Sequence, residues 1–398
     1  MSIQEQVISR IDGNKVVELT RELIKIPSFV GQENDIGQFI YDRMLKISHD
    51  VKIIAAEEKR PNVLCRYRGS ENEQSLILVG HTDTIYLNDQ EKEKWTVDPF
   101  EGIVKDNKIY GLGATDMKSA IAAMIIAIEA IADSSVKLLN DTILIFCVDE
   151  EKGSTKGMQY LIDQKMIEPK MAVGIQGEPT NMRVQGWFKG WAEYEIITRG
   201  KAAHSSKFEE GINAIHGMND ILQSLRGRGL KYKEHPLLGK STLSIGTIQG
   251  GVSAKIVPDS CKSLIEVRMV PGQSTKAVLK EIAHLIEKLR ARNPKLAAEI
   301  KLIRGKDPAE IPVNSPIVEL ARSTAKELTG ELPDYGREPI AGGDVNLLIR
   351  HLQIPSVLFG PGILENAHAP DEFVPVRNVV DISKIYASLI LKYCGYCD

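Results

Sequence analysis

The apolar positions of the first half of the chain follow two patterns. Residues 15–26 and 35–47 carry apolar side chains at helical spacing. Apolar or alternating runs that indicate β-strands come next, and helical segments such as 117–133 lie between several of them. These runs are VKIIAAE, NVLCRYRG, SLILVGHTD, TILIFCVDEE and MAVGIQGEPT. Strands that alternate with helices predict an α/β fold with helices on both faces of the sheet.

The pattern changes after the last of these runs. The stretch RVQGWFKGWAEYEIITRGKAAHSS alternates like an exposed antiparallel strand pair, and a helix, two strand runs, a helix over 274–292 and a final strand follow it. This order is typical of a small α+β domain. A chain of 398 residues also exceeds what one hydrophobic core usually supports. We therefore expect a discontinuous domain of residues 1–182 and 307–398, with a second domain, 183–306, inserted in it.

Composition narrows the class of protein. The chain is 43% hydrophobic and 26% charged with a net charge of −3, which gives no reason to expect nucleic acid or an anionic membrane as a partner. The N-terminus resembles no targeting signal, and the longest apolar run, 120–128, is too short to span a membrane. We expect a cytoplasmic protein. Cys394 and Cys397 form a CxxC, but no second thiol pair or nearby histidine supports a metal or redox role.

Five short stretches carry acids or histidines just after a strand or at the start of a helix: GHTDT, GLGATDMKSA, VDEEKGS, QGEPT and NAHAPDE. In α/β sheets, ligands bind at the carboxyl ends of the strands. His81 and Asp83 should point the same way from a strand, which suits a metal ligand and the carboxylate that holds it. Alternatively, His81 caps the strand and Asp83 begins a turn. Asp116, taken alone, is better explained as an ordinary helix-start aspartate.

Glu150 and Glu151 are adjacent carboxylates, which repel each other unless a cation is near. In extended chain they face opposite sides, so one could bind a cation and the other transfer a proton; the alternative is a solvated acidic turn. Glu178 and His368 could be a polar strand end and a loop histidine. Together, however, these residues could hold two divalent ions that share a carboxylate, as in two-metal hydrolases. Mixed nitrogen and oxygen ligands suit zinc, with cobalt or manganese as substitutes.

In this order and spacing, the five stretches closely resemble the metallopeptidase and deacylase family that includes acetylornithine deacetylase, succinyl-diaminopimelate desuccinylase, aminoacylase and glutamate carboxypeptidase. The likeness covers nearly the whole chain. It implies a zinc-exopeptidase-like domain with a mixed, mostly parallel sheet, and an inserted ferredoxin-like lid and dimerisation domain. It also implies that His81, Asp116 and Glu178 hold one zinc, and that Asp116, Glu151 and His368 hold another, with Asp116 bridging.

The resemblance implies further roles around the metals. Glu150 is expected to act as the general base that deprotonates the attacking water and later protonates the leaving amine. Asp83 is expected to orient His81, which fixes the ring and raises its basicity. The peptide bond between Asp116 and Met117 is expected to be cis.

In the inserted domain, the resemblance places His204 in the active site of a partner subunit, where it would stabilise an oxyanion. It places Arg268 at the substrate carboxylate, a task that suits a guanidinium. Lys255 stands where relatives usually have asparagine, so it could alter charge preference or anchor a second carboxylate. Gly342 and Gly343 belong to a glycine-rich loop that lines the pocket, and this loop lacks the fuller pattern of the desuccinylase.

The sequence thus predicts a metal-dependent hydrolase of amide bonds that acts on an N-acyl-amino acid, in the manner of acetylornithine deacetylase. A dipeptidase or carboxypeptidase of the same family is the nearest alternative, because one metal centre hydrolyses any secondary amide. A catalytically inactive binding protein is an alternative of another class. All six expected ligand and base positions carry residue types that can do the chemistry, which argues against it. The expected assembly is a homodimer through the inserted domain.

Overall fold

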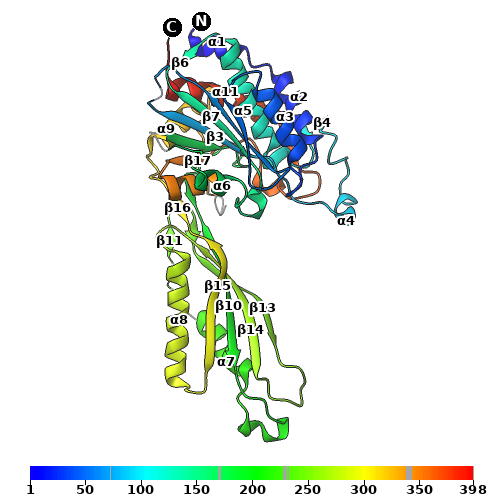
Figure 1. Ribbon diagram of the computed structural model, residues 1–398, viewed down its shortest axis with the longest axis vertical. Helices are drawn as coiled ribbons and strands as arrows, with labels where there is room; N and C mark the ends of the chain where they lie inside the picture. The colour runs from blue at the N-terminus through cyan, green and yellow to red at the C-terminus, as the bar shows by residue number, and fades with distance from the viewer. Residues whose placement is uncertain (72, 169–171, 227–230, 232, 338–342, 398) are drawn as a thin grey trace. The chain divides into compact units, whose positions relative to one another are not determined.

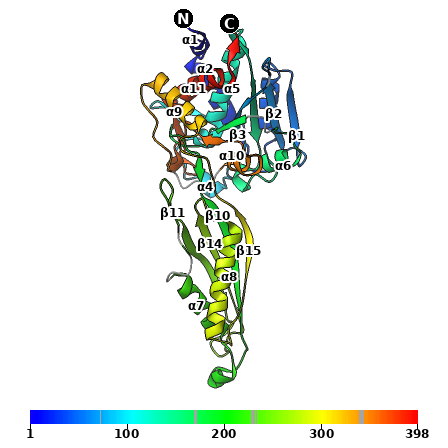
Figure 2. The same ribbon diagram turned by 90° about the vertical axis from the view of Figure 1, so that its left-hand side faces the viewer.

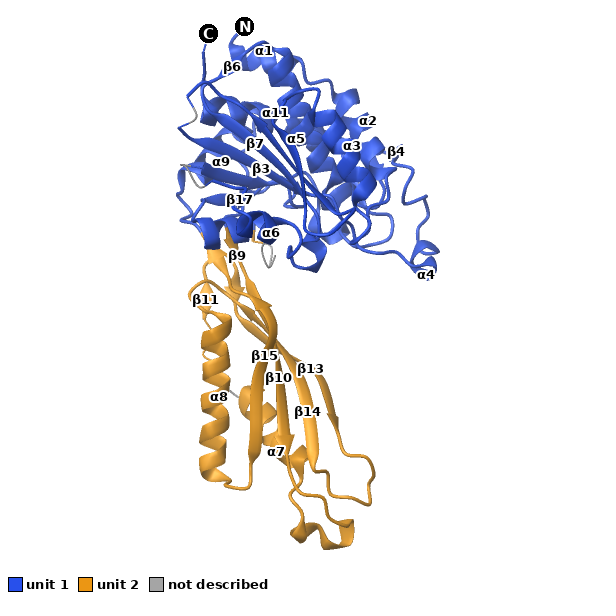
Figure 3. Ribbon diagram, viewed as in Figure 1, with its two compact units in different colours: residues 1–186, 311–336, 343–398 blue, residues 187–310, 337–342 orange. Residues whose placement is uncertain are grey.

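The computed structural model divides the chain into two compact units (Figure 3). It describes residues 1–71, 73–168, 172–226, 231, 233–337 and 343–397. The first unit, here unit 1, contains residues 1–186, 311–336 and 343–398, and unit 2 contains residues 187–310 and 337–342. The boundaries expected at 182/183 and 306/307 lie at 186/187 and 310/311, four residues further along the chain.

The centre of unit 1 is a mixed sheet (Figure 1). The described residues form its six strands, in the order β1-β2-β7-β3-β8-β17. Their bounds are Val51–Ala55, Pro61–Tyr67, Asp141–Cys147, Ser75–His81, Ala172–Gln176 and Ser356–Leu358. The last four strands are parallel to one another, whereas β1 and β2 pair antiparallel. The expected mixed, mostly parallel sheet is confirmed. Strands β3 and β7 are buried at every position, which explains their continuous apolar runs.

Helices cover both faces of this sheet. Neighbouring residues of β8 point to opposite faces. Val173 and Ile175 pack in the same core as helix α5. A Cβ atom on Gly174 would lie on the other face, 3.3 Å from Leu348, which comes just after α10. Helix α5 is apolar on nearly all sides because it packs between strand β3 and the helices α2 and α11. The bounds of the helices are α1 Ile3–Ser9, α2 Gly13–Ile24, α3 Asn34–Met44, α4 Asp89–Lys92, α5 Ser119–Asp133, α6 Met158–Asp163, α9 Pro316–Thr329, α10 Asp344–Leu347 and α11 Val376–Cys394.

Short strands complete unit 1. Strands β4, β5 and β18 form one small sheet, and β6 pairs with β19. Their bounds are Ile103–Lys105, Lys108–Tyr110, Phe373–Pro375, Lys137–Leu138 and Tyr396–Cys397.

The thiol of Cys394 is buried and lies 3.3 Å from the carbonyl oxygen of Asp141, whereas Cys397 is exposed and all described cysteines are free. No helix built from the described residues has the length and apolar surface needed to cross a membrane.

Unit 2 contains an antiparallel sheet with helices on one face (Figure 2). Its described residues form four strands in the order β13-β14-β10-β15, and α7 and α8 supply the covering side chains. The bounds are β10 Gly190–Arg199, α7 Ala214–Ser224, β13 Thr242–Gly250, β14 Ser260–Met269, α8 Thr275–Arg292 and β15 Ala297–Lys306, with short pairs β9 Trp187–Phe188 and β16 Ala309–Glu310, and β11 Glu234–His235 and β12 Gly239–Lys240. This order of elements is the expected ferredoxin-like arrangement.

One expectation for unit 2 is wrong. The stretch that begins this region does not form an exposed strand pair, because β10 is a single strand between β14 and β15. Its alternation has another cause: Ala192, Tyr194 and Ile196 face the helices, whereas the side chains between them face away from that core.

Candidate metal centre

The residues with expected metal roles come from loops at one edge of the sheet of unit 1. His81 is the last residue of β3, and Glu178 follows two residues after the parallel strand β8. Asp116 lies in η1 (Ala114–Lys118), directly before α5, and the turn with Glu151 follows β7. Parallel strands end at the same edge of a sheet, so local sequence order brings these side chains together.

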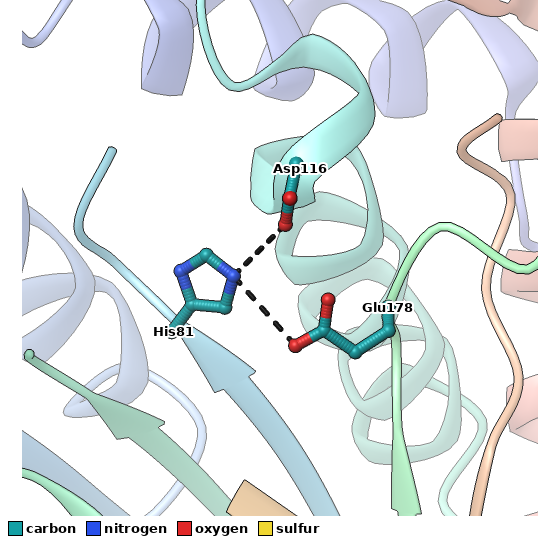
Figure 4. Close-up of side chains that lie close together, drawn as sticks. All are labelled: His81, Asp116 and Glu178. Carbon is teal, nitrogen blue, oxygen red and sulfur yellow. Dashed lines mark hydrogen bonds and ion pairs between the residues drawn. The ribbon is translucent and has the colours of Figure 1, made fainter. Parts of the chain in front are cut away.

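His81, Asp116 and Glu178 form the first candidate ligand group (Figure 4). Nε2 of His81 lies 3.0 Å from Oδ1 of Asp116 and 3.7 Å from Oε1 of Glu178. Four ligands placed tetrahedrally at about 2.0–2.1 Å from a zinc ion lie about 3.3 Å apart. The spacing and the mixed donor set therefore fit a divalent ion.

Asp116, Glu151 and His368 form a second group among the described residues. Nε2 of His368 lies 2.8 Å from Oε1 of Glu151 and 3.5 Å from Oδ2 of Asp116. Asp116 thus presents Oδ1 to the first group and Oδ2 to the second, the arrangement of a carboxylate that bridges two ions. The expected cis peptide bond between Asp116 and Met117 is confirmed.

Asp83 makes different contacts from those expected. Nδ1 of His81 lies 3.0 Å from the main-chain oxygen of Asp83, and a carbonyl oxygen only accepts. Nδ1 therefore carries the proton, which leaves Nε2 for a cation. The carboxylate of Asp83 lies 3.7 Å from that ring and instead accepts the backbone N–H groups of Glu150 and Glu151, both at 3.1 Å. The main chain orients the ring, and the side chain holds the next loop.

Glu150 and Glu151 do not lie in extended chain, and this part of the sequence-based interpretation is wrong. They form a 3₁₀ turn, η2 (Glu150–Lys152), after Asp149, whose φ of 70° reverses the chain. The turn points both backbone N–H groups at Asp83. Glu151 reaches His368, and the negative charge of Glu150 is one of those that raise the pKa of Glu178. The two carboxylates still differ in their surroundings, but the turn that contains both, and not the alternation of a strand, is the cause.

The electrostatics of the site are those of a cation site. Burial raises the pKa of Glu178 well above its usual value, and the charge of Asp116 adds to this shift. Burial likewise raises the pKa of Asp83 to about 7. The hydrogen bond to Glu151 raises the pKa of His368 to about 9, because the surrounding carboxylates favour a positive charge there. Metal ions would supply the positive charge that the carboxylates lack.

Sequence reasoning missed the residues that support these ligands. Gln176 donates from Nε2 to Oε1 of Glu178 at 2.6 Å, and its Oε1 accepts the N–H of Val345 at 3.0 Å. The only signal in the sequence is a polar residue at the end of the apolar strand β8. A Cβ atom on Gly343 would lie 2.5 Å from Oε1 of Gln176, so a larger residue there would displace the Gln176 amide that contacts Glu178. Gly342 lies outside the described residues.

The expected substrate residues of unit 2 lie at opposite ends of its sheet. The exposed His204 is next to Lys255, whose carbonyl accepts the N–H of Ser205 at 2.9 Å. Both lie beyond the end of β14 at Ser260, whereas Arg268 lies near its other end, where it pairs with Glu266 at 2.6 Å. Eight residues at about 3.3 Å each separate the two ends, about 26 Å. One copy of unit 2 therefore does not bring His204 and Arg268 together.

An α/β sheet with two carboxylate and histidine groups at the carboxyl ends of its strands defines a class, the metal-dependent amidohydrolases and metallopeptidases. The family model described as Peptidase family M20/M25/M40 matches residues 77–392. The chain belongs to this family and is a metal-dependent amidohydrolase. The expected family is thereby confirmed.

Individual proteins similar to this chain include an acetylornithine deacetylase of Buchnera aphidicola, 29% identical over 95% of this chain and 98% of that protein. Two solved structures share the fold. Aminopeptidase PepT from Bacillus cereus has a TM-score of 0.77 at 19% identity, over 96% of this chain and 98% of that one. A dinuclear metal binding peptidase of the M20 family from Bacillus subtilis has a TM-score of 0.74 at 17% identity, over 97% and 99%.

Proposed function

We propose that this protein hydrolyses the amide bond of an N-acyl-amino acid with two divalent metal ions, in the manner of an acetylornithine deacetylase. The observation that carries the proposal is the position of Asp116, whose two carboxylate oxygens each face a histidine and a further carboxylate. Zinc is the ion that best suits this donor set, and cobalt or manganese would substitute. The similarity to acetylornithine deacetylases over 95% of the chain supports the substrate class.

When bound, the two ions polarise the scissile carbonyl and acidify the attacking water. His81, Asp116 and Glu178 would hold one ion, and Asp116, Glu151 and His368 would hold the other. Glu150 takes the proton of the water and passes it to the leaving amine. Its position depends on Asp83, whose carboxylate accepts the N–H groups of the turn that carries Glu150 and Glu151.

The homodimer is part of the proposal. His204 is exposed and lies beyond the end of β14 at Ser260, which is itself about 26 Å from Arg268 along the strand. If Arg268 binds the substrate carboxylate, His204 of the same copy does not reach that substrate, so a second copy must supply the oxyanion donor. Apolar side chains near His204 are exposed, namely Phe208 (64%), Val252 (90%) and Ile256 (43%), as a contact surface would require. A monomer in light scattering that retains full activity would contradict this assembly.

The substrate depends on residues outside the metal centre. A dipeptidase or carboxypeptidase is the second candidate, because the metal centre hydrolyses any secondary amide and the surrounding pocket selects among them. Lys255, in place of the asparagine expected from the resemblance, favours a substrate with an additional negative charge. The substrate preference of this enzyme would then differ from that of its relatives.

The test is the metal content of the purified protein together with kcat/KM on matched panels of N-acetyl-amino acids and dipeptides, before and after chelation. We expect about two equivalents of zinc, loss of activity on chelation, recovery with zinc or cobalt, and higher kcat/KM on the acylated amino acids. Higher kcat/KM on dipeptides across the panel would reject the deacylase. Absence of bound metal, with no hydrolysis after metal is added, would reject the proposed function altogether.

A further inference from the structure

Glu372 is a buried carboxylate outside both ligand groups, and it contacts the loop that carries Asp116. Its exposure is 2%. Oε1 accepts the backbone N–H groups of Thr115 at 2.8 Å and of Asp116 at 3.1 Å, and Oε2 accepts that of Gly113 at 3.1 Å. Carboxylates make stronger hydrogen bonds than neutral acceptors, so these three bonds hold the loop firmly.

The same two segments are joined by main-chain and hydroxyl contacts. The N–H of Gly111 donates to the carbonyl of Glu372 at 2.9 Å, and Oγ1 of Thr115 donates to the carbonyl of Phe373 at 2.7 Å. Oγ1 of Thr115 also accepts the N–H of Ile363 at 3.2 Å. The segment 363–373, which contains His368, is thus connected at several points to the Asp116 loop. Glu372 provides the buried carboxyl group of this connection.

The His368 segment adopts a backbone conformation that needs such support. His368 has a φ of 60° and Asp371 a φ of 56°, values that non-glycine residues adopt rarely and at some cost. Asp371 is fixed on one side, because its carboxylate accepts the N–H and hydroxyl groups of Thr96, both at 2.8 Å. Glu372 fixes the other side. Without it, three backbone N–H groups would be buried without that acceptor, which proteins avoid.

We propose that Glu372 is a positioning residue that sets the distance between Asp116 and His368, and thereby the affinity of the second ligand group for its metal ion. This proposal rests on the proposed function, because it requires that both ligand groups bind metal.

The effect should differ between the two ligand groups. In the second group, Asp116 and His368 both belong to the segments that Glu372 joins, and only Glu151 comes from elsewhere. In the first group, Asp116 is the one member that belongs to those segments, whereas His81 ends strand β3 and Glu178 follows strand β8. Loss of the Glu372 carboxylate should therefore weaken one metal site much more than the other.

The test is Glu372→Gln, which keeps the size of the side chain but removes its charge and directs an amide N–H₂ group at backbone donors. Zinc and cobalt are titrated into the chelated protein, with chelator competition for the affinities and visible absorption of cobalt for the coordination. The matched control is Glu365→Gln, the same change at an exposed position of the same segment. A melting curve of each metal-free variant verifies folding.

We expect Glu372→Gln to bind the first equivalent within about threefold of wild type and the second about ten- to hundredfold more weakly, with an altered cobalt spectrum. Glu365→Gln should match wild type at both steps. If Glu372→Gln does not fold, Glu372→Asp takes its place; it keeps the charge but shortens the reach, and the same selective weakening is expected.

Normal affinity for both equivalents, or an equal loss at both, would overturn the role of Glu372. A wild-type protein that binds fewer than two equivalents would instead overturn the two-metal function, so the two failures are distinguishable.

Discussion

Two regions differ in how firmly they hold the proposed functional residues. One is the edge of the unit 1 sheet with the ligand groups around Asp116, here called the metal edge. The other is the part of unit 2 that contains His204 and Lys255, here called the tip. At the metal edge, His81 is buried, its ring is fixed by the main-chain oxygen of Asp83, and Glu178 accepts a hydrogen bond from Gln176. At the tip, His204 and Lys255 are exposed, and the ring of His204 contacts Ser206 within its own loop. The reaction centre is thus organised within one chain, whereas the tip offers groups that a second molecule would complete.

The comparison bears on how catalysis and substrate selection are divided. Buried, mutually supporting residues keep the preorganised geometry that bond cleavage requires. Exposed groups on a separate sheet, such as Lys255, can be substituted without disturbing the metal ligands. We infer that the first region determines the reaction and that the second, which the proposed homodimer would supply from a partner copy, contributes to its rate and selectivity.

Glu150→Gln should give the largest effect. The amide keeps the shape of the side chain but does not accept a proton, so kcat should fall about 10³- to 10⁴-fold. Metal content should stay at the wild-type value, because Glu150 belongs to neither ligand group. Steady-state kinetics with metal analysis measures both. Activity near the wild-type rate would show that another residue is the base.

His204→Ala should give the next largest effect, a fall in kcat of about 10²- to 10³-fold, as for the loss of one oxyanion donor. Metal affinity should not change. His216→Ala, at another exposed histidine of unit 2, is the matched control and should retain full activity. If both variants behave like wild type, the tip takes no part in the reaction.

Asp83→Asn should lower kcat about 10- to 100-fold, because an amide replaces one of the oxygens that hold Glu150 and Glu151. The first metal equivalent should bind as in wild type, because the main chain orients His81. Kinetics and zinc titration measured together separate the two roles of Asp83. A large loss of zinc affinity at unchanged kcat would show that the Asp83 carboxylate orients His81, as the sequence analysis expected.

Lys255→Asn should give the smallest effect. It introduces the residue that the family resemblance leads us to expect there and should shift kcat/KM by about tenfold away from substrates with an additional carboxylate and toward neutral ones. Thermal stability should not change, because Lys255 is exposed. A panel of N-acetyl-amino acids with acidic and neutral side chains tests this shift, and an unchanged ranking would remove Lys255 from substrate selection.

The sequence predicted the parts of the molecule that depend on strand order. Residues at the carboxyl ends of parallel strands meet at one edge, so the sequence predicted that His81 and Glu178 lie close together, whereas the division of the ligands into two groups that share Asp116 came from the family resemblance. The apolar runs of β3 and β7 likewise indicated a sheet buried on both faces.

Contacts between side chains and distant backbone were not predictable. Asp83 accepts N–H groups 67 and 68 residues away, and the bonds of Glu372 span 256 to 259 residues. No local pattern marks such partners. The turn at Glu150 and Glu151 depends on the same distant carboxylate, so alternation along a strand gave the wrong geometry there.

The most direct test of the division between the two regions is subunit complementation. Glu150→Gln and His204→Ala variants, each nearly inactive, are mixed, dissociated and reassociated. A mixed dimer then contains one site with wild-type Glu150 from one copy and wild-type His204 from the other. The account predicts recovery of about a quarter of wild-type activity, because half the dimers are mixed and each has one complete site. No recovery, in a mixture shown to contain mixed dimers, would contradict a site completed by the partner copy.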